Sequence, residues 1–409
     1  MKKVYFFSFI FVLSLFNFCA GIQKNKSINK LNWIEISTKN FFPQVIVDFD
    51  HPFYFERRIH KDKLCLELAF PGMTLKAFNT KKVIEKLKAL KNIVKNVEIF
   101  YKKTPSPRVI LLMSFVNKND VLIRWSKMED PNRLILDIFS KKFLNNIESK
   151  DDILLYAQND MSIYGANKFL GNVINLGQPL NFNSVKKKIR ILIDAGHGGE
   201  DCGAKGFFGL KEKDISLDIA RRVKFLLKKN GYNVYLTRNK DKTLSLIERC
   251  ELAGQLKANL CVSVHVNAVG GIEKVNGIES YYLNAKNLLP PFRKGGFLFV
   301  FNKKDKKCAK KADRLLYEHV KLSKKLAIVI QNSILKVAKN KKINIFNRGI
   351  KKEEFRILLS CQIPVALIEV GFLTNKKEAK RLSLPFYRKI LAEGIGKGII
   401  EYINLRYYK

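Results

Sequence analysis

The second half of the chain alternates between short apolar runs, which suit buried strands, and longer amphipathic segments, which suit helices. The strand-like runs are residues 191–193, 233–236, 260–264, 278–283 and 364–368. Apolar residues at helical spacing predict helices over about 214–229, 246–257 and 323–338. Strands separated by helices build a mostly parallel sheet that helices cover on both faces. We therefore predict an α/β fold, a mostly parallel twisted sheet flanked by helices, from residue 189 onward.

A glycine-rich loop follows the first of these strands. Between residues 194 and 209, glycine occupies positions 196, 198, 199, 203, 206 and 209, and a single histidine, His197, stands among them. Because glycine lacks a Cβ atom, such a loop allows the backbone to come close to another group. The loop is therefore a candidate part of a binding site.

Polar residues that often bind metals follow three of the predicted strands. His197, His265 and Glu369 come after the first, third and last strand, respectively. Ligands of open parallel sheets bind at the carboxyl ends of the strands, so we expect these side chains to meet at one edge. Glu212 lies just before the first predicted helix, and its loop can fold back to the same place.

Two imidazoles and a carboxylate with an open fourth position form a known arrangement for catalytic zinc, and a second carboxylate can take a proton from the bound water. Magnesium or calcium would favour more oxygen ligands and no histidine. Each residue has a structural alternative: Glu212 could stabilise a helix N-terminus, and Glu369 could pair with a lysine. Their joint occurrence favours zinc. The spacing does not say which glutamate binds the metal and which one moves the proton.

The first part of the chain contains a different pattern. Short strands are predicted over residues 45–49, 64–70, 97–101, 108–115 and 133–138, separated by turn signals and by one amphipathic helix over about 81–90. This pattern predicts a small β-sandwich domain over residues 40–140. Residues 141–188 have no sustained period, and we interpret them as a linker before the catalytic domain at 189–405.

The N-terminus is typical of a secretory signal peptide over residues 1–21. It has a basic start, an apolar stretch over residues 4–18, and the small residues Ala20 and Gly21. We therefore expect export to the periplasm or cell envelope. The apolar stretch is short for a bilayer span, and no later stretch is long enough, so no transmembrane span is expected in the mature chain. Cys19 suggests a lipoprotein, but Phe18 is too bulky for the usual lipobox.

The chain is strongly basic. It carries 76 Lys and Arg against 36 Asp and Glu, a formal net charge of +40, which favours anionic partners. The lysines are spread along the chain and do not cluster with aromatic residues, which argues against nucleic acid. Together with the signal peptide, the charge favours an envelope polymer. The 7 cysteines contain no Cys-x-x-Cys pair, so neither a disulfide framework nor a thiolate zinc site is indicated.

Five segments of the second half resemble known signatures. They are Asp194-Ala-Gly-His-Gly-Gly-Glu-Asp-Cys-Gly-Ala204, Gly209-Leu-Lys-Glu-Lys-Asp214, Leu236-Thr-Arg238, Ser263-Val-His-Val-Asn-Ala268 and Pro364-Val-Ala-Leu-Ile-Glu-Val-Gly-Phe-Leu-Thr-Asn375. In this order they resemble the zinc-dependent N-acetylmuramoyl-L-alanine amidases, cell-wall hydrolases with an amidase type 3 catalytic domain. The resemblance covers about residues 189–405.

The resemblance implies a reaction and roles for the four polar residues. His197, Glu212 and His265 would bind one Zn²⁺ ion, and Glu369 would act as general base and then as proton donor. Zinc-activated water would cut the amide bond between N-acetylmuramic acid and L-alanine in peptidoglycan, during wall remodelling or daughter-cell separation. Asn267 and Arg238 also occupy family positions, where holding loops and contacting substrate are equally compatible with the sequence.

Two further segments carry expectations from the resemblance. The β-rich residues 40–140, with the closing Asn132-Arg-Leu-Ile-Leu-Asp-Ile-Phe139, resemble the AMIN domain that directs such amidases to the wall. Residues 286–322 form an insert with a predicted helix over 306–322. Some relatives carry a helix here that covers the zinc until an activator with a LytM-type domain removes it. The resemblance thus implies a regulatory insert and an activator as partner, with Glu318 or His319 near the metal; the alternative is a surface helix with ordinary amphipathic packing.

Two other functions remain open at this point. A zinc peptidase that cuts within the stem peptide would use the same ligands. A non-catalytic peptidoglycan-binding protein would need none of them, and the presence of all four polar residues speaks against it.

Overall fold

The computed structural model describes residues 31–37, 44–49, 53, 55–60, 65–71, 84–85, 93–102, 108–116, 121–129, 132–140, 144, 188–270, 274–286, 288, 295–299 and 306–407. The predicted signal peptide lies outside the described residues, as does nearly all of the predicted linker. The helix predicted over 81–90 is described only at residues 84–85. None of the helices in the described part is long and apolar enough to cross a membrane.

A six-stranded sheet forms the centre of the second half, in the order β10-β9-β11-β15-β12-β14. The strands are β9 (Arg190–Ala195), β10 (Asn233–Leu236), β11 (Leu260–Asn267), β12 (Ile278–Leu283), β14 (Asn347–Glu353) and β15 (Val365–Phe372). All neighbours are parallel except β12 and β15, which are antiparallel. The predicted mostly parallel sheet is confirmed. The edge strand β14 was not predicted, because its sequence Asn-Arg-Gly-Ile-Lys-Lys-Glu is polar and has no apolar alternation.

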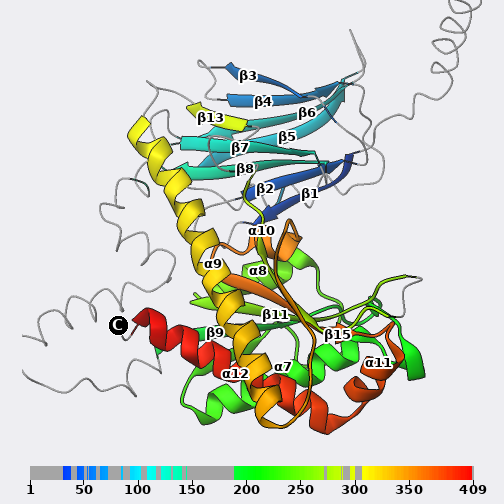
Figure 1. Cartoon of the computed structure of the whole chain (residues 1–409). Helices are drawn as coiled ribbons and strands as arrows, with labels where there is room; N and C mark the ends of the chain where they lie inside the picture. Colours follow the sequence, from blue (N-terminus) through cyan, green and yellow to red (C-terminus); the bar gives the residue numbers. More distant parts are fainter. Residues whose placement is uncertain are drawn as a thin grey trace, which may run out of the picture.

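Helices cover both faces of this sheet (Figure 1). They are α7 (Glu212–Lys229), α8 (Leu246–Gln255), α9 (Lys306–Asn340), α10 (Arg356–Ser360), α11 (Lys376–Ser383) and α12 (Pro385–Tyr407), and a short 3-10 turn, η1, spans Phe207–Gly209. The apolar sides of α7, α9 and α12 share one core with the sheet, and α8 and α10 pack in a second core on its other face. The two helices predicted over 306–322 and 323–338 are one continuous helix, α9, of 35 residues.

Helix α12 carries two glycines where it crosses α9. A Cβ atom at position 394 would lie 2.6 Å from the Cα atom of Ile334, and one at position 398 would lie 2.7 Å from the Cα atom of Ile330. The two helices therefore approach each other more closely than any residue with a side chain would allow. These glycines interrupt the apolar period in the sequence, which explains why no helix was predicted there.

The first half forms a β-sandwich of two antiparallel sheets, as predicted. One sheet has the order β1-β2-β8-β7-β13 and the other β3-β4-β6-β5. The strands are β1 (Leu31–Ser37), β2 (Gln44–Phe49), β3 (Glu56–His60), β4 (Cys65–Pro71), β5 (Val94–Lys102), β6 (Arg108–Phe115), β7 (Val121–Glu129), β8 (Asn132–Ser140) and β13 (Gly295–Phe299). An apolar core lies between the sheets. The first strand begins before residue 40, the boundary predicted from the sequence.

The sandwich packs on the catalytic domain through the outer face of its five-stranded sheet. Every residue of β2 is buried, because its alternate side chains face the sandwich core and the neighbouring domain. On the outer face, Ile46 and Ile135 join an apolar cluster with Cys250 and Ala253 of α8 and Leu358 of α10. An antiparallel strand whose residues are buried on both faces has cover on both sides. The catalytic domain provides that cover.

The predicted insert is attached to the sandwich. Its strand β13 pairs antiparallel with β7, and α9 runs from beside the sandwich into the catalytic core (Figure 1). The buried Arg124 of β7 pairs with Asp137 and donates a hydrogen bond from Nη1 to the carbonyl oxygen of Ala312 at 2.8 Å. The start of α9 is thereby anchored to the N-terminal sheet.

His319 lies at this junction, in the part of α9 that contacts the sandwich. It is buried against the backbone of Leu358, and the positive charge of Arg124 is close. Within the described residues, neither His319 nor Glu318 belongs to the group of side chains that could hold a metal. Neither residue is therefore a candidate ligand, and the expectation that one of them lies near the metal stays a prediction.

We predict that His319 makes stability depend on pH. Burial lowers the pKa of His319 from the ordinary 6.5 to about 4. Between these values the unfolded chain binds the proton and the folded chain does not, so stability falls as the pH drops below 6.5 and levels off near 4. The full loss is about 3 kcal/mol. Urea unfolding at pH 7.5 and 4.5 should show a loss about 2 kcal/mol larger in the wild type than in His319→Leu. Equal losses in the two proteins would contradict this role.

Candidate active site

The glycine-rich loop after β9 brings His197 and His265 together. His197 adopts a left-handed backbone conformation with φ of 58°. A Cβ atom at position 196 would lie 2.5 Å from the ring of His265, and one at position 203 would lie 2.5 Å from the carboxylate of Glu212. Glycine at these two positions lets the loop close against both side chains. The two imidazole rings are 5.0 Å apart between centroids and nearly perpendicular.

Glu212, the first residue of α7, lies between the two imidazoles. Its Oε2 is 3.1 Å from His197 Nε2, and its Oε1 is 2.9 Å from His265 Nδ1. The backbone N–H groups of Ala204 and Val266 donate to the same carboxylate at 2.8 and 2.9 Å, and hold it in place. One candidate ligand atom of each of the three residues lies within 4.8 Å of the others. The structure thus brings His197, Glu212 and His265 into one compact group.

The ionised carboxylate of this group suits a cation. Burial alone would raise the pKa of Glu212, but hydrogen bonds from His197 and His265 lower it well below its ordinary value. Burial disfavours a charged His197, yet its hydrogen bond with Glu212 and that carboxylate's charge raise the pKa of its imidazole. An ionised carboxylate with two converging imidazole nitrogens fits zinc, which takes two nitrogens and one oxygen and keeps a fourth position open.

Asp201 orients His197. Its Oδ2 is 2.7 Å from His197 Nδ1, so Nδ1 holds the proton and Nε2 is left to face Glu212. The sequence analysis missed this role. The signal was present, because Asp201 lies four residues after His197 in the same loop.

We predict that Asp201→Ala weakens zinc affinity by about 10- to 100-fold, because a carboxylate behind a ligating histidine fixes its tautomer and orientation. Competition with a chromophoric chelator measures the affinity. The control is Glu200→Ala, which removes the same charge from the neighbouring exposed position and should bind zinc as the wild type does. Equal affinities of the two variants would exclude a specific role for Asp201.

Glu369 lies on β15 beside this group. Its Cα partner on β11 is His265, so both side chains emerge on the same face of the sheet. Glu369 is buried, and its Oε2 has no hydrogen-bond partner among the described residues. Burial, with the charges of Glu212 and Glu279, raises the pKa of Glu369 well above its ordinary value. A carboxyl group whose pKa is raised in this way accepts a proton more readily than an ordinary carboxylate, and can return it later in a reaction.

For Arg238 and Asn267, the sequence did not decide between holding a loop and contacting substrate. Their surroundings in the structure differ. Arg238 is buried and donates hydrogen bonds to the backbone carbonyls of Ala195, Gly196 and Lys213. These bonds hold the histidine loop against the start of α7. Asn267 donates from Nδ2 to Glu279 Oε1 at 2.8 Å, one strand beyond Glu369.

Comparisons with known proteins find similar chains over the second half of this one. The family model of N-acetylmuramoyl-L-alanine amidase (Amidase_3) matches residues 191–401. A putative N-acetylmuramoyl-L-alanine amidase of Buchnera aphidicola is 34% identical over 238 residues, which cover 55% of this chain and 98% of the relative. Amidase AmiC of Escherichia coli O6:H1 is 32% identical over 224 residues, 53% of each chain. The solved structure of amidase AmiC2 of Nostoc punctiforme is 31% identical, with a TM-score of 0.41, and the alignment covers 53% of this chain and 97% of that chain.

The match covers the second half of the chain and confirms the amidase relationship predicted there. The family model does not reach the β-sandwich, so the AMIN resemblance stays a prediction. The chain belongs to the N-acetylmuramoyl-L-alanine amidase family, whose reaction is hydrolysis of the amide bond between N-acetylmuramic acid and L-alanine in peptidoglycan.

Proposed function

We propose that this chain is a zinc-dependent amidase of the cell envelope, with zinc held by His197, Glu212 and His265 and with Glu369 as general base and proton donor. One observation carries the proposal. A group with the donor set of a catalytic zinc site lies beside a buried carboxyl group, and one oxygen of that carboxyl has no partner among the described residues. Zinc bound there would polarise the amide carbonyl and make a water molecule acidic at neutral pH.

The residues of the chain would then move one proton. Glu369 in its ionised form takes the proton of the attacking water as the new C–O bond forms at the amide carbon. It returns this proton to the amide nitrogen as the C–N bond breaks, so the stem peptide leaves as a neutral amine. Proton transfer of this kind contributes about 10²- to 10⁴-fold to a rate. The backbone N–H groups on Glu212 keep its carboxylate fixed during the reaction.

Digestion of purified peptidoglycan tests the function. The mature protein should release free stem peptides with L-alanine amino termini, a chelator should stop the release, and added zinc should restore it. Shortened peptides still attached to muramic acid would instead identify a peptidase of the stem peptide. If no covalent product forms although the protein binds peptidoglycan, the protein is a non-catalytic wall-binding protein.

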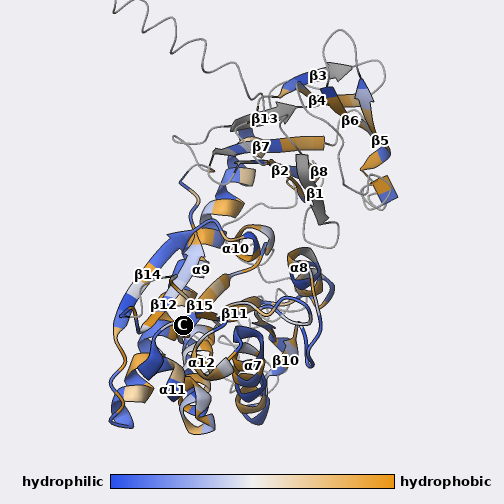
Figure 2. Cartoon of the chain, turned by 90° about the vertical axis from the view of Figure 1, so that its right-hand side faces the viewer, coloured by the Kyte–Doolittle hydropathy of each residue, from blue (hydrophilic) through white to orange (hydrophobic). Residues whose placement is uncertain are grey.

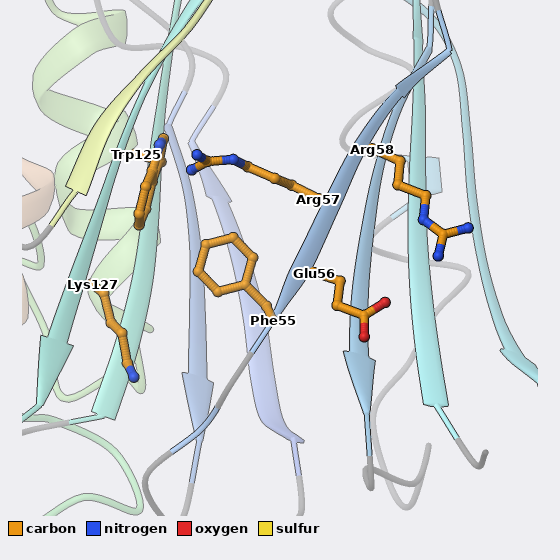
Figure 3. A pocket seen from close by; sticks show the side chains of 6 residues that line it. All are labelled: Phe55, Glu56, Arg57, Arg58, Trp125 and Lys127. Carbon is orange, nitrogen blue, oxygen red and sulfur yellow. The ribbon is translucent and has the colours of Figure 1, made fainter.

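We further propose that the β-sandwich is an AMIN-like domain that targets the enzyme to the wall. A hollow of about 590 Å³ on the sandwich is lined by Phe55, Glu56, Arg57, Arg58, Trp125 and Lys127. Figure 3 shows Arg57 extending toward the ring of Trp125, and its guanidinium carbon lies 4.8 Å from the ring centroid. Aromatic rings beside cationic side chains suit an anionic polymer that also has apolar faces.

We predict that Arg57→Gln with Lys127→Gln weakens sedimentation with purified peptidoglycan by roughly 5- to 30-fold, since each lost charge contact is worth about 0.5–1 kcal/mol. Turnover of a small soluble muramoyl-peptide should not change. The control is Lys95→Gln, which removes an exposed positive charge from β5 of the same sandwich at a position that does not line the hollow. If the double variant still sediments like the wild type, the hollow is not the wall-binding surface.

Residues 1–21 support export to the periplasm or envelope, and the net charge of +40 supports peptidoglycan as partner.

We propose that the insert 286–322 gates the site and that an activator of the LytM type acts on it. The attachment of β13 to β7 supplies a fixed point for such a gate. Deleting residues 290–304 should raise wall-lytic activity without an activator, and unchanged activity of the folded deletion would count against gating.

A further inference from the structure

The row of active-site residues continues across the sheet beyond Glu369. Glu279 of β12 is the Cα partner of Glu369, just as Glu369 is the partner of His265. Residues directly opposite each other in a sheet carry their side chains on the same face. Figure 2 shows β11, β15, β12 and β14 following one another in this order. The surface beside the catalytic carboxyl therefore leads to Glu279 and then to β14.

Glu279 is buried and takes hydrogen bonds from four side chains. Asn267 Nδ2 and Arg348 Nε donate at 2.8 Å, and the hydroxyl of Tyr281 and Lys351 Nζ donate at 2.5 Å. Burial would raise the pKa of Glu279, but the hydrogen bonds from Lys351, Tyr281 and Arg348 lower it. Glu279 is therefore ionised at neutral pH. Its single carboxylate pairs with two cations, Arg348 and Lys351.

The two cations remain accessible although the carboxylate is not. The side chain of Arg348 is 27% exposed and that of Lys351 is 37% exposed, whereas that of Glu279 is 2% exposed. Arg348 contacts Glu279 through Nε, and a guanidinium presents further donors in a planar fork that suits a carboxylate. Neighbouring strands are about 4.8 Å apart, so an anion at β14 would lie roughly 10 Å from Glu369.

In the substrate of the proposed amidase, free carboxylates lie on only one side of the scissile amide bond. The carboxyl group of muramic acid is consumed in the scissile amide, so the free carboxylates belong to the stem peptide. We propose that Arg348 and Lys351, positioned by Glu279, bind a carboxylate of the stem peptide. The inference rests on the proposed function. It places the peptide, the leaving group of the reaction, on the β12–β14 side of Glu369, with the metal group on the other side.

Two synthetic muramoyl-peptides test this subsite: one with free peptide carboxylates, and one in which every carboxylate is a carboxamide. The full mature chain with zinc should cleave the carboxylate form with a kcat/KM about 10- to 100-fold higher, mainly through KM, as expected for charge-assisted hydrogen bonds. Arg348→Gln and Lys351→Gln should each reduce this preference, the ratio of the two kcat/KM values, by roughly 10-fold. Arg348→Lys should recover part of the preference.

The control is Lys352→Gln, the same change at the next position of β14. Lys351 is paired with Tyr281 and Lys352 with Tyr282, so their side chains point to opposite faces, and the control should keep the full preference. Equal kcat/KM values of the wild type for the two substrates would overturn the subsite, as would equal losses on both substrates in the variants. If Arg348→Gln does not fold, the substrate preference of Lys351→Gln, a change on the edge strand, decides whether the subsite exists. If the wild type cleaves neither substrate, the amidase function fails and the subsite with it.

Discussion

Replacing Glu369 with glutamine should lower kcat by about 10²- to 10⁴-fold and leave zinc binding and folding unchanged. Glutamine has nearly the same shape as glutamate but cannot take a proton, and it fits the same buried position on β15. Release of L-alanine amino termini from peptidoglycan measures the rate, and metal analysis of the same sample measures zinc. Glu393→Gln, the same change in α12, is the control. A Glu369→Gln enzyme with the wild-type rate would remove Glu369 from its assigned role.

The size of this effect follows from the surroundings of Glu369. The residue lies beside the candidate metal group but is not part of it, because among the described residues that group consists of His197, Glu212 and His265. Its unpartnered Oε2 shows that the fold does not use this oxygen for structure within the described residues. A buried polar atom without a partner is costly, and such atoms are typical of sites that serve substrate or water. The loss should therefore appear in turnover and hardly in stability.

The second large effect concerns the support beneath the histidine loop. Asp194 is buried at the end of β9 and accepts hydrogen bonds from Arg249 Nη1 at 2.7 Å, Ser263 Oγ at 2.6 Å and Thr237 Oγ1 at 2.7 Å. Arg249 also donates to the carbonyl oxygens of Ala195 and His197. This buried ion pair connects α8 to the loop that carries the first candidate ligand.

We predict that Asp194→Ala lowers the free energy of unfolding of the catalytic domain by about 3–5 kcal/mol, because Arg249 is left as a buried cation without its carboxylate. Denaturant unfolding of the single variants and of Asp194→Ala with Arg249→Met measures the coupling. The double variant should be more stable than Asp194→Ala alone, because the unpaired charge is gone. A loss below about 1 kcal/mol in the single variant would contradict the importance of this pair.

The sequence was most informative where the hydrophobic period of the segments and the positions of the polar residues pointed to the same structure. The strands of the parallel sheet alternate with helices, and the polar residues at the strand ends predicted that distant positions meet at one edge. The structure brings His197, Glu212 and His265 together, and their chemical roles remain predictions. Asp201 was missed because its role depends on which imidazole nitrogen it contacts. Glu279 was missed because the strand over 278–283 was predicted without its antiparallel pairing to β15, and Arg348 because the polar edge strand β14 has no periodic signal.

The relation between the two halves was also beyond the sequence. The β-sandwich was predicted as a separate domain before a linker, but its outer face shares an apolar cluster with α8 and α10. The last strand of its five-stranded sheet, β13, comes from the insert, far along the chain from its partner β7. Pairing over such a separation cannot be derived from local patterns. The apolar run of β2, which is buried on both faces, was the one local hint of a covered sheet.

The zinc content of the folded protein tests the central claim most directly. After purification and dialysis against trace zinc, elemental analysis of the wild type should find one zinc ion per chain. Glu212→Ala and His265→Ala should retain almost none, with circular dichroism showing that both remain folded. Folded wild-type protein that binds no zinc even after supplementation would contradict the account, and so would variants that still bind one ion per chain.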